Sequence, residues 1–267
     1  MKIYAALPPI SEGGENVNNQ TIEKLSTLKL QAMIREYRRQ LELSAMNELP
    51  FDERLALMVD AECLSRFNNR LKRLIKAANL RDPSACLEDL DYDAKRKLDK
   101  STIARLSDGE WISAGKNLII TGATGTGKTY LSCAFGNAAC RLGKKVRAYR
   151  TNRLLTDLEI GRGDGSYNKI LADLKKPDLL ILDDFGMAPL DAAACRDLME
   201  VVDDRYESKS IMITAQLPVA SWHPLFEDAT IADAVLDRIV NNSYRIQLAG
   251  PTKRQPTTQD VAAAAGE

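Results

Sequence analysis

The amino-acid sequence predicts an α/β protein in which a small all-helical domain precedes a parallel five-stranded sheet. Up to about Trp111, apolar residues recur at helical spacing. From Asn117 onward, short apolar runs alternate with helical stretches, a pattern that is typical of a parallel sheet covered by helices. A glycine-rich turn directly after the first apolar run is the third observation.

The chain divides into four predicted parts. Residues 1–20 are rich in Gly, Pro, Asn and Ser, and we expect them to be flexible. Residues 21–110 form the helical N-terminal domain and residues 111–250 the α/β domain. The remaining residues, 251–267, are expected to be a tail.

Two long helices are predicted in the N-terminal domain. The first covers residues 21–42, where Leu, Met, Ile and Tyr recur at helical spacing. The second begins after Pro50 and runs to about residue 80. Its acidic residues come early and its basic residues late, an order that suits the helix dipole.

Five short apolar runs predict the strands of the sheet: NLIIT, KVRAYR, DLLILD, SIMITA and YRIQLA. Helical stretches separate them, as the crossovers of a parallel sheet require.

The composition excludes several classes of protein. Lys and Arg together number 37, as do Asp and Glu, so any attraction to nucleic acid must come from local patches. The five cysteines form no C-x-x-C pair and there is one histidine, which argues against a disulfide framework or a zinc site. No apolar run reaches the roughly 18 residues of a membrane span, and the N-terminus does not read as a signal peptide. We therefore expect a cytoplasmic protein without a membrane partner.

The turn after the first strand is GATGTGKT, Gly122–Thr129, which fits G-x-x-x-x-G-K-[S/T] without a gap. Its glycines let successive backbone N–H groups point at phosphate oxygens, and the following helix adds its positive end. Lys128 supplies charge to β- and γ-phosphates, and the Thr129 hydroxyl suits Mg²⁺. The sequence thus predicts ATP and Mg²⁺ as cofactors, with the nucleotide held by Gly122, Ala123, Thr124, Gly125, Thr126, Gly127, Lys128, Thr129 and Tyr130.

The run LLILDDFG ends an apolar stretch with two adjacent carboxylates, which repel each other and lose water on burial. A metal ion beside Lys128 would make the pair tolerable. Asp183, at a strand end, is then the Mg²⁺ ligand, and Asp184 orients and polarises the attacking water. The alternative is that Asp184 only supports the metal site.

Two further positions could complete the site. Gln216 follows the fourth strand beside Thr214, where it could hold the attacking water or could simply be a polar strand end. Arg238, on a later helix, could reach the nucleotide of a neighbouring subunit. Its alternative is a surface ion pair with Asp233 or Asp237.

Two basic clusters could track a DNA backbone, and an aromatic side chain there could stack or wedge. The alternative for each cluster is a solvated surface. The first lies late in the second helix and the second on a predicted loop; they are Arg66, Arg70, Lys72, Arg73 and Lys76, and then Arg162, Tyr167 and Lys169.

Several stretches together resemble one family. TGATGTGKTYLSCAFGNAACRLG, DGSYNKIL, LLILDDFG, ITAQLPVASWHP, ADAVLDRIVNNSYRI and the N-terminal FDERLALMVDAECLSRFNNRLKRLIKAANL look like the IstB transposition helper ATPases. These belong to the AAA+ class and are similar to DnaC-type helicase loaders. The resemblance covers roughly residues 21–250.

The resemblance implies an ATPase, slow and stimulated by DNA, that oligomerises on double-stranded target DNA, remodels it and recruits or activates a partner transposase. It makes Lys128, Thr129, Asp183, Asp184, Gln216 and Arg238 the ATPase residues. Too few residues follow Arg238 for the helical lid of other AAA+ proteins, so we expect no C-terminal lid. The alternatives are a replicative helicase loader, an ATP-switched DNA clamp with little turnover, and a small-molecule kinase, against which Arg238 and the basic clusters argue.

Overall fold

The computed structural model describes residues 14–252, which form two compact units. The first unit runs to Arg70 and the second begins at Leu71. The sequence placed this boundary between residues 110 and 111, which is wrong. Residues 71–110 belong to the second unit because their apolar side chains, Ile103 and Leu106 among them, are buried in one of its two cores.

The first unit consists of helices. The predicted helix over residues 21–42 is two helices, and the first begins inside the segment that was expected to be flexible. The chain turns between them at Lys29, which has a φ of 60°. The predicted second long helix is confirmed, and it contributes residues to both units. The elements are α1 (Gly14–Thr27), α2 (Gln31–Glu42), the 3-10 helix η1 (Ser44–Glu48) and α3 (Phe51–Ala78).

Buried polar contacts hold the helices of the first unit together. The Glu62 carboxylate of α3 accepts hydrogen bonds from the backbone N–H groups of Ala32 (2.9 Å) and Met33 (3.2 Å). It thereby caps the N-terminus of α2. The Tyr37 hydroxyl donates to the Asn18 side chain over 2.6 Å. This bond ties α1 to α2 and helps explain why helix forms before residue 21 despite several poor helix formers.

The second unit is built on a parallel sheet of five strands, as the sequence predicted. Their order is β2-β3-β4-β1-β5, and all pairs are parallel. β4 therefore separates β1 from β3. The strands are β1 (Asn117–Gly122), β2 (Val146–Arg150), β3 (Leu179–Phe185), β4 (Ser210–Ala215) and β5 (Ser243–Leu248).

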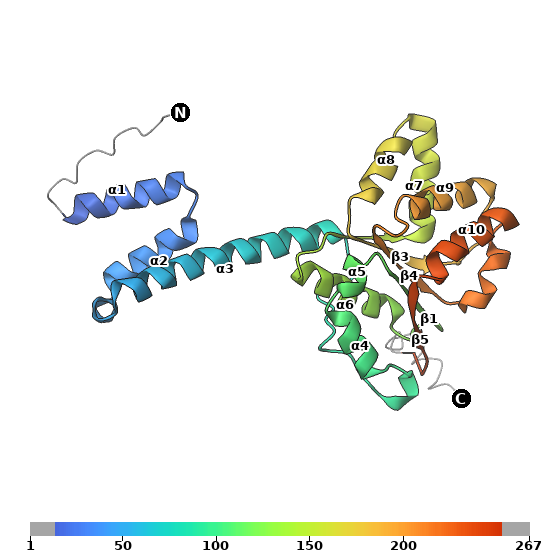
Figure 1. Ribbon diagram of the computed structural model, residues 1–267, viewed down its shortest axis with the longest axis horizontal. Coiled ribbons are helices and arrows are strands. Elements are labelled where there is room, and N and C mark those ends of the chain that lie inside the picture. The colour runs from blue at the N-terminus through green and yellow to red at the C-terminus, as the bar shows by residue number, and fades with distance from the viewer. Residues whose placement is uncertain (1–13, 253–267) are drawn as a thin grey trace, which may run out of the picture. The chain divides into compact units, whose positions relative to one another are not determined.

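Helices cover both faces of this sheet (Figure 1). Alternate residues of each strand enter different cores, so that Leu118 and Ile120 face one layer and Ile119 the other. The first layer contains α4 (Lys100–Ser107), α5 (Glu110–Ser113) and α6 (Lys128–Arg141). The second contains α7 (Thr151–Asp164), α8 (Tyr167–Lys175), α9 (Ala192–Asp203) and α10 (Ala229–Val240). Short 3-10 turns are η2 (Ala94–Arg96), η3 (Val219–Ser221) and η4 (His223–Leu225).

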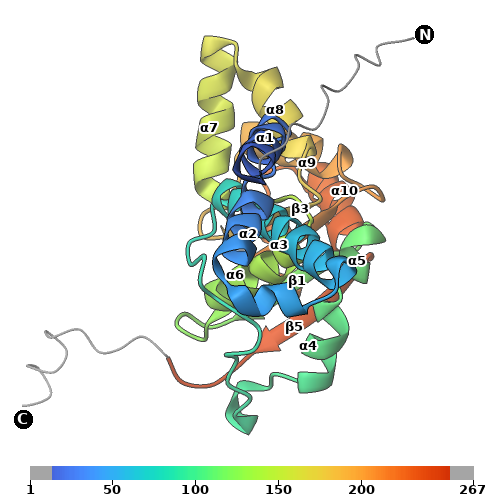
Figure 2. The same ribbon diagram turned by 90° about the vertical axis from the view of Figure 1, so that its left-hand side faces the viewer.

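The connection between β2 and β3 differs from the sequence prediction. α7 and α8 form a pair of adjacent helices (Figure 2), so the predicted loop that carries the second basic cluster is a helix end and a helix start. No helix follows β5 within residues 14–252, while residues 1–13 of the predicted flexible segment and most of the predicted tail lie outside the described residues. Within that range, no helix is both long and apolar enough to cross a membrane.

Candidate nucleotide-binding site

The glycine-rich turn joins the carboxyl end of β1 to the first residue of α6. Gly125 and Gly127 have φ values of 82° and 94°, in the left-handed region that glycine adopts without strain. The space around Gly127 is also closed, because a Cβ there would lie 2.9 Å from Nη2 of Arg96. Left-handed turns of this kind present backbone N–H groups to anions, and α6 adds the positive end of its dipole.

Lys128 lies inside this loop. It is 7% exposed, and its Nζ donates a hydrogen bond to the backbone carbonyl of Ala123 over 2.8 Å. The ammonium group is therefore held at the loop, where β- and γ-phosphates bind in P-loop proteins.

Asp183 is surrounded by hydroxyl groups. The Thr129 hydroxyl donates to its carboxylate, 3.2 and 3.1 Å from the two oxygens, and the Thr214 hydroxyl donates to the same carboxylate. Three neighbouring elements, α6, β3 and β4, thus converge on one buried acid. A carboxylate with an adjacent threonine hydroxyl is an all-oxygen donor set, which suits Mg²⁺ bound together with phosphates and water.

Asp184 has a different environment. Its φ is 58°, a conformation that costs a non-glycine residue about 1–2 kcal/mol, and its N–H donates to the Thr214 hydroxyl over 3.0 Å. The pairing of β3 with β4 shifts register between Leu182 and Phe185. Consequently, the Asp184 side chain leaves the strand alternation and lines the same cavity as Lys128. The two aspartates are therefore separated by backbone geometry.

Gln216 lines this cavity as well. It follows the last residue of β4, and its amide nitrogen lies 3.1 Å from the sulfur of Met187. Sulfur is a weak acceptor, so this contact leaves the amide able to bind a stronger one.

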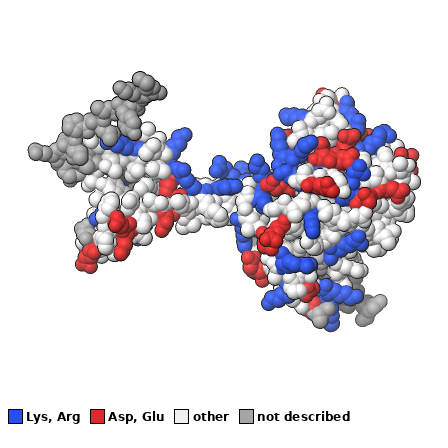
Figure 3. All heavy atoms as spheres, in the orientation of Figure 1, with Lys and Arg blue, Asp and Glu red and all other residues white. Residues whose placement is uncertain are grey.

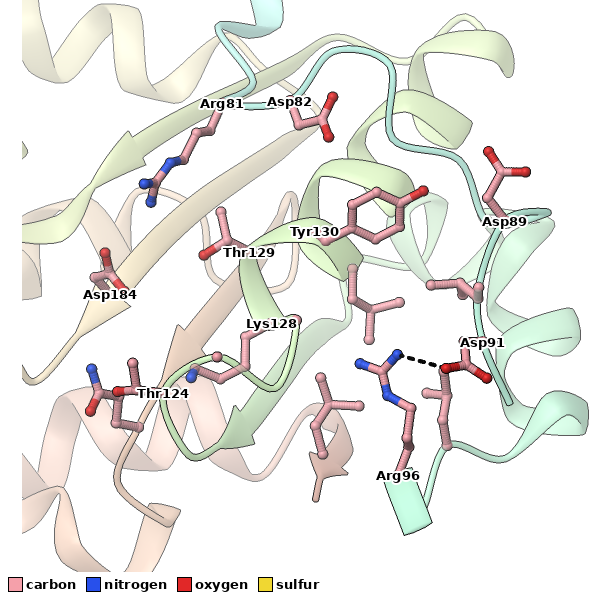
Figure 4. Close-up of a pocket in the computed structure, with 17 residues that line it drawn as sticks. Arg81, Asp82, Asp89, Asp91, Arg96, Thr124, Lys128, Thr129, Tyr130 and Asp184 are labelled. Atoms are coloured by element: carbon pink, nitrogen blue, oxygen red, sulfur yellow. Dashed lines mark ion pairs between the residues drawn. The ribbon is translucent and has the colours of Figure 1, made fainter. Parts of the chain in front are cut away.

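The other wall of the cavity comes from residues that sequence reasoning missed. The cavity measures about 770 Å³ and is shown in Figure 4, where Arg96 forms an ion pair with Asp91 over 3.8 Å. Arg96 also donates to the Thr126 carbonyl of the loop. The segment between α3 and α4 carries no motif that would have revealed it; its lining residues are Arg81, Asp82, Asp89, Leu90, Asp91, Arg96 and Leu98.

Apolar and charged side chains both line the cavity. Leu90, Leu98, Tyr130 and Leu248 lie among its lining residues, as do Asp184 and the loop residues described above. A cavity with this composition can hold a flat base at one end and phosphates at the other.

Among the predicted ATPase residues, Lys128, Thr129, Asp184 and Gln216 line this cavity, and Asp183 lines the adjoining one. Arg238 lines neither cavity. The Asn117 side chain, at the start of β1, donates to the Arg238 carbonyl over 3.2 Å, whereas the phosphate loop follows the end of β1. The guanidinium forms an ion pair with Asp203 at 2.5 Å and lies over the Tyr206 ring. The partner is therefore neither Asp233 nor Asp237. A role in a neighbouring subunit stays a prediction.

The basic cluster on α3 is exposed along the helix (Figure 3). Arg66 forms an ion pair with Glu62 at 2.9 Å. The role of this cluster in binding DNA stays a prediction.

The second basic cluster is tied to the core of its own unit. Arg162 pairs with Asp197, whose side chain is only 3% exposed, and the guanidinium lies 4.1 Å from the centre of the Tyr167 ring. The Tyr167 hydroxyl donates to Asp197 over 2.8 Å. Burial and this bond raise the pKa of Tyr167 to about 12. Two of the three members therefore have a structural role.

No three His, Cys, Asp or Glu side chains within residues 14–252 form a group that could hold a metal by themselves.

Comparison with known proteins identifies what the chain resembles. A family model described as IstB-like ATP binding protein matches residues 23–260. A Sinorhizobium fredii protein, y4pL, named for an insertion sequence and for ATP binding, is 40% identical over 235 residues, covering 88% of this chain and 96% of that protein. An ATP-binding protein named for insertion sequence IS1162 of Pseudomonas fluorescens is 48% identical over 202 residues, which cover 76% of this chain and 87% of that protein.

Solved structures share the fold. The DnaC helicase loader matches with a TM-score of 0.52 and 21% identity, over 61% of this chain and 96% of that one. AMPPCP-bound DnaA from Aquifex aeolicus matches with a TM-score of 0.53 and 19% identity, over 63% of this chain and 51% of that one. The second unit therefore has the fold of AAA+ P-loop proteins.

Proposed function

Because the chain belongs to the family of IstB-like ATP-binding proteins, we propose that it is a DNA-binding ATPase that assists transposition. It assembles as an oligomer on double-stranded target DNA, remodels that DNA, and recruits or activates a partner transposase. The names of its relatives, which refer to insertion sequences, support the transposase as the partner.

The separation of Asp183 from Asp184 carries the proposal of hydrolysis. Asp183 lies between the hydroxyls of Thr129 and Thr214 and would hold Mg²⁺ together with Thr129. The chemistry that this ion supplies is neutralisation of charge on the β- and γ-phosphates. Asp184 faces the cavity without sharing that position, so its carboxylate is available to orient a water molecule and accept its proton.

The remaining roles follow from position. Lys128, held at the loop carbonyl of Ala123, would exchange that bond for phosphate oxygens. Gln216, which lines the same cavity as Lys128 and Asp184, would donate its amide N–H to the γ-phosphate or the water. Arg238 lies away from this cavity in its own chain, so it would act on the nucleotide of a neighbouring subunit.

Steady-state ATP turnover tests this function. We expect slow hydrolysis that duplex DNA accelerates, and Asp184→Asn should bind ATP as tightly as the wild type but hydrolyse it at least about 100-fold more slowly, as expected for loss of a general base. Lys128→Ala is the control that should lose ATP binding itself. Wild-type turnover by Asp184→Asn would exclude Asp184 from the chemistry, and an absence of DNA stimulation would contradict a DNA-activated ATPase.

A further inference from the structure

We propose that Arg81 detects the γ-phosphate of ATP from within its own chain. This inference rests on the nucleotide site proposed above and adds to it a residue from the segment between α3 and α4. Arg81 lies three positions after the last residue of α3, so it would link nucleotide state to that helix.

Two contacts and one left-handed residue fix the backbone on the N-terminal side of Arg81. Arg147 of β2 donates to the Ala77 carbonyl over 2.8 Å. Asn79, with a φ of 53°, ends α3 in the left-handed conformation that commonly stops helices. Leu80 is 8% exposed, and it closes the space over Gly136 of α6, where a Cβ would lie 2.8 Å from its Cδ2.

The backbone on the C-terminal side is fixed as well. The Asn137 side chain of α6 donates to the carbonyls of Pro83 and Ala85, each over 3.0 Å. Burial raises the pKa of the Cys133 thiol of α6, and hydrogen bonds from the backbone of residues 81 and 82 oppose that rise. The segment is therefore bound along α6, the helix that begins with Lys128.

The Arg81 side chain, by contrast, makes no hydrogen bond or ion pair with another residue between 14 and 252. In Figure 4 it extends toward Thr129 and Asp184. It lines the nucleotide cavity and also the adjoining cavity of about 850 Å³ that contains Asp183. Arg96, on the same wall, already bonds to Thr126 and Asp91.

This position matches the charged end of the nucleotide. The γ-phosphate would lie among Lys128, Thr129 and Asp184, and the guanidinium that points toward this place can bind two of its oxygens at once. ADP lacks those oxygens.

Binding of fluorescent nucleotides tests the inference in the full-length protein with Mg²⁺. We compare a non-hydrolysable N-methylanthraniloyl ATP analogue with N-methylanthraniloyl ADP on wild type, Arg81→Ala and Arg81→Lys. The matched control is Arg153→Ala, which lines only the adjoining cavity and pairs with Asp157 on the same helix.

Arg81→Ala should weaken binding of the ATP analogue at least about tenfold, since a hydrogen bond to a charged group typically contributes that much affinity or more. ADP affinity should stay within twofold, which also shows that the cavity is intact. Arg81→Lys should recover part of the loss. In hydrogen exchange on the wild type, the ATP analogue should protect residues 79–82 more than ADP does. In Arg81→Ala, the two nucleotides should protect these residues equally.

Three results would overturn the inference while leaving the proposed function in place: equal losses for both nucleotides, no loss for either, or the same ATP-specific loss in Arg153→Ala. A wild type that binds neither nucleotide would overturn the proposed function itself.

Discussion

The backbone N–H of Asp184 donates a hydrogen bond to the hydroxyl of Thr214 over 3.0 Å. The same hydroxyl donates to the carboxylate of Asp183. A single side chain on β4 thus fixes the backbone of one aspartate and the side chain of the other. Both carboxylates at the end of β3 line the adjoining cavity, but only Asp184 also lines the cavity that contains Lys128.

Replacing Thr214 tests that arrangement. Thr214→Val keeps the shape but leaves the Asp184 N–H without its partner and removes one of the two hydroxyl groups that donate to the Asp183 carboxylate. We therefore expect the unfolding free energy to fall by about 1–3 kcal/mol. ATP turnover should fall at least about tenfold, because the Asp184 backbone is no longer held in its left-handed conformation. Thermal unfolding and steady-state turnover measure both effects.

Thr214→Ser is the control, since serine retains the hydroxyl, and it should keep most of both properties. If Thr214→Val turned ATP over at the wild-type rate, the hydroxyl would not be needed to separate the two carboxylates.

Asp183 should govern the metal requirement of nucleotide binding. Chelation of Mg²⁺ should weaken binding of the ATP analogue to the wild type, whereas Asp183→Asn should bind it weakly with or without Mg²⁺, because the ligand charge is gone. Titration of Mg²⁺ at fixed nucleotide gives the comparison. Asp184→Asn, its neighbour, should keep the wild-type response to Mg²⁺, and a loss of that response in both variants would argue against separate roles.

Sequence reasoning found the parts of this site that local patterns encode. The spacing from Gly122 to Thr129 identified the phosphate loop, and the apolar run before Asp183 identified its strand. Both signals are short and continuous, since each depends on a turn or a strand end. The five parallel strands followed from the same alternation of apolar runs.

The contributions of Arg81 and Arg96 could not be predicted in the same way. They depend on how the segment after α3 packs along α6, which is a long-range contact with no fixed residue spacing. The wrong boundary at residue 110 has the same cause: helical residues look alike in sequence whether they pack among themselves or, as Leu106 does, into the core of the sheet unit.

The basic cluster on α3 should contact DNA phosphates. Changing Arg70, Arg73 and Lys76 together to Ala should weaken binding to all duplex sequences alike. It should also flatten the plot of log affinity against log salt by about 0.9 for each lost phosphate contact. Fluorescence anisotropy at several salt concentrations measures both.

A matched triple variant removes equal charge elsewhere. Arg141, Lys175 and Lys176 each pair with a surface carboxylate, and their change to Ala should leave the slope unaltered. The same flattening in both triple variants would mean that net charge, and not the α3 cluster, sets the salt dependence.

Arg162 and Lys169 should behave differently despite their proximity in sequence. Arg162→Ala leaves the buried Asp197 without its cation, so the unfolding free energy should fall. Lys169 lies at an exposed position of α8. The unfolding free energy of Lys169→Ala should therefore stay within about 0.5 kcal/mol of the wild-type value. Urea unfolding gives the comparison, and equal stability of the two variants would remove the structural role assigned to Arg162. Because Lys169→Ala should fold as stably as the wild type, a change in its DNA affinity would indicate a contact between Lys169 and DNA.

Arg238 should act between subunits. In the single chain it pairs with Asp203, away from the phosphate loop, so ATP turnover should rise faster than linearly with protein concentration. Arg238→Ala should bind ATP normally and lose most of its turnover, since such arginines contribute about 10³–10⁵ in rate in other P-loop enzymes. Arg245→Ala, an exposed arginine on β5, is the control and should keep wild-type turnover.

Mixing variants separates action between subunits from action within one. Arg238→Ala retains its phosphate loop, and Lys128→Ala retains its arginine, so neither hydrolyses ATP alone. In a mixed oligomer, however, the Lys128→Ala subunit can supply Arg238 to the intact loop of its neighbour, and part of the turnover should return. The recovered rate should vary with the ratio of the two variants and disappear on dilution, since it requires contact between them. Absence of recovery in mixtures that co-assemble on DNA, or full turnover by isolated monomers, would place the action of Arg238 elsewhere.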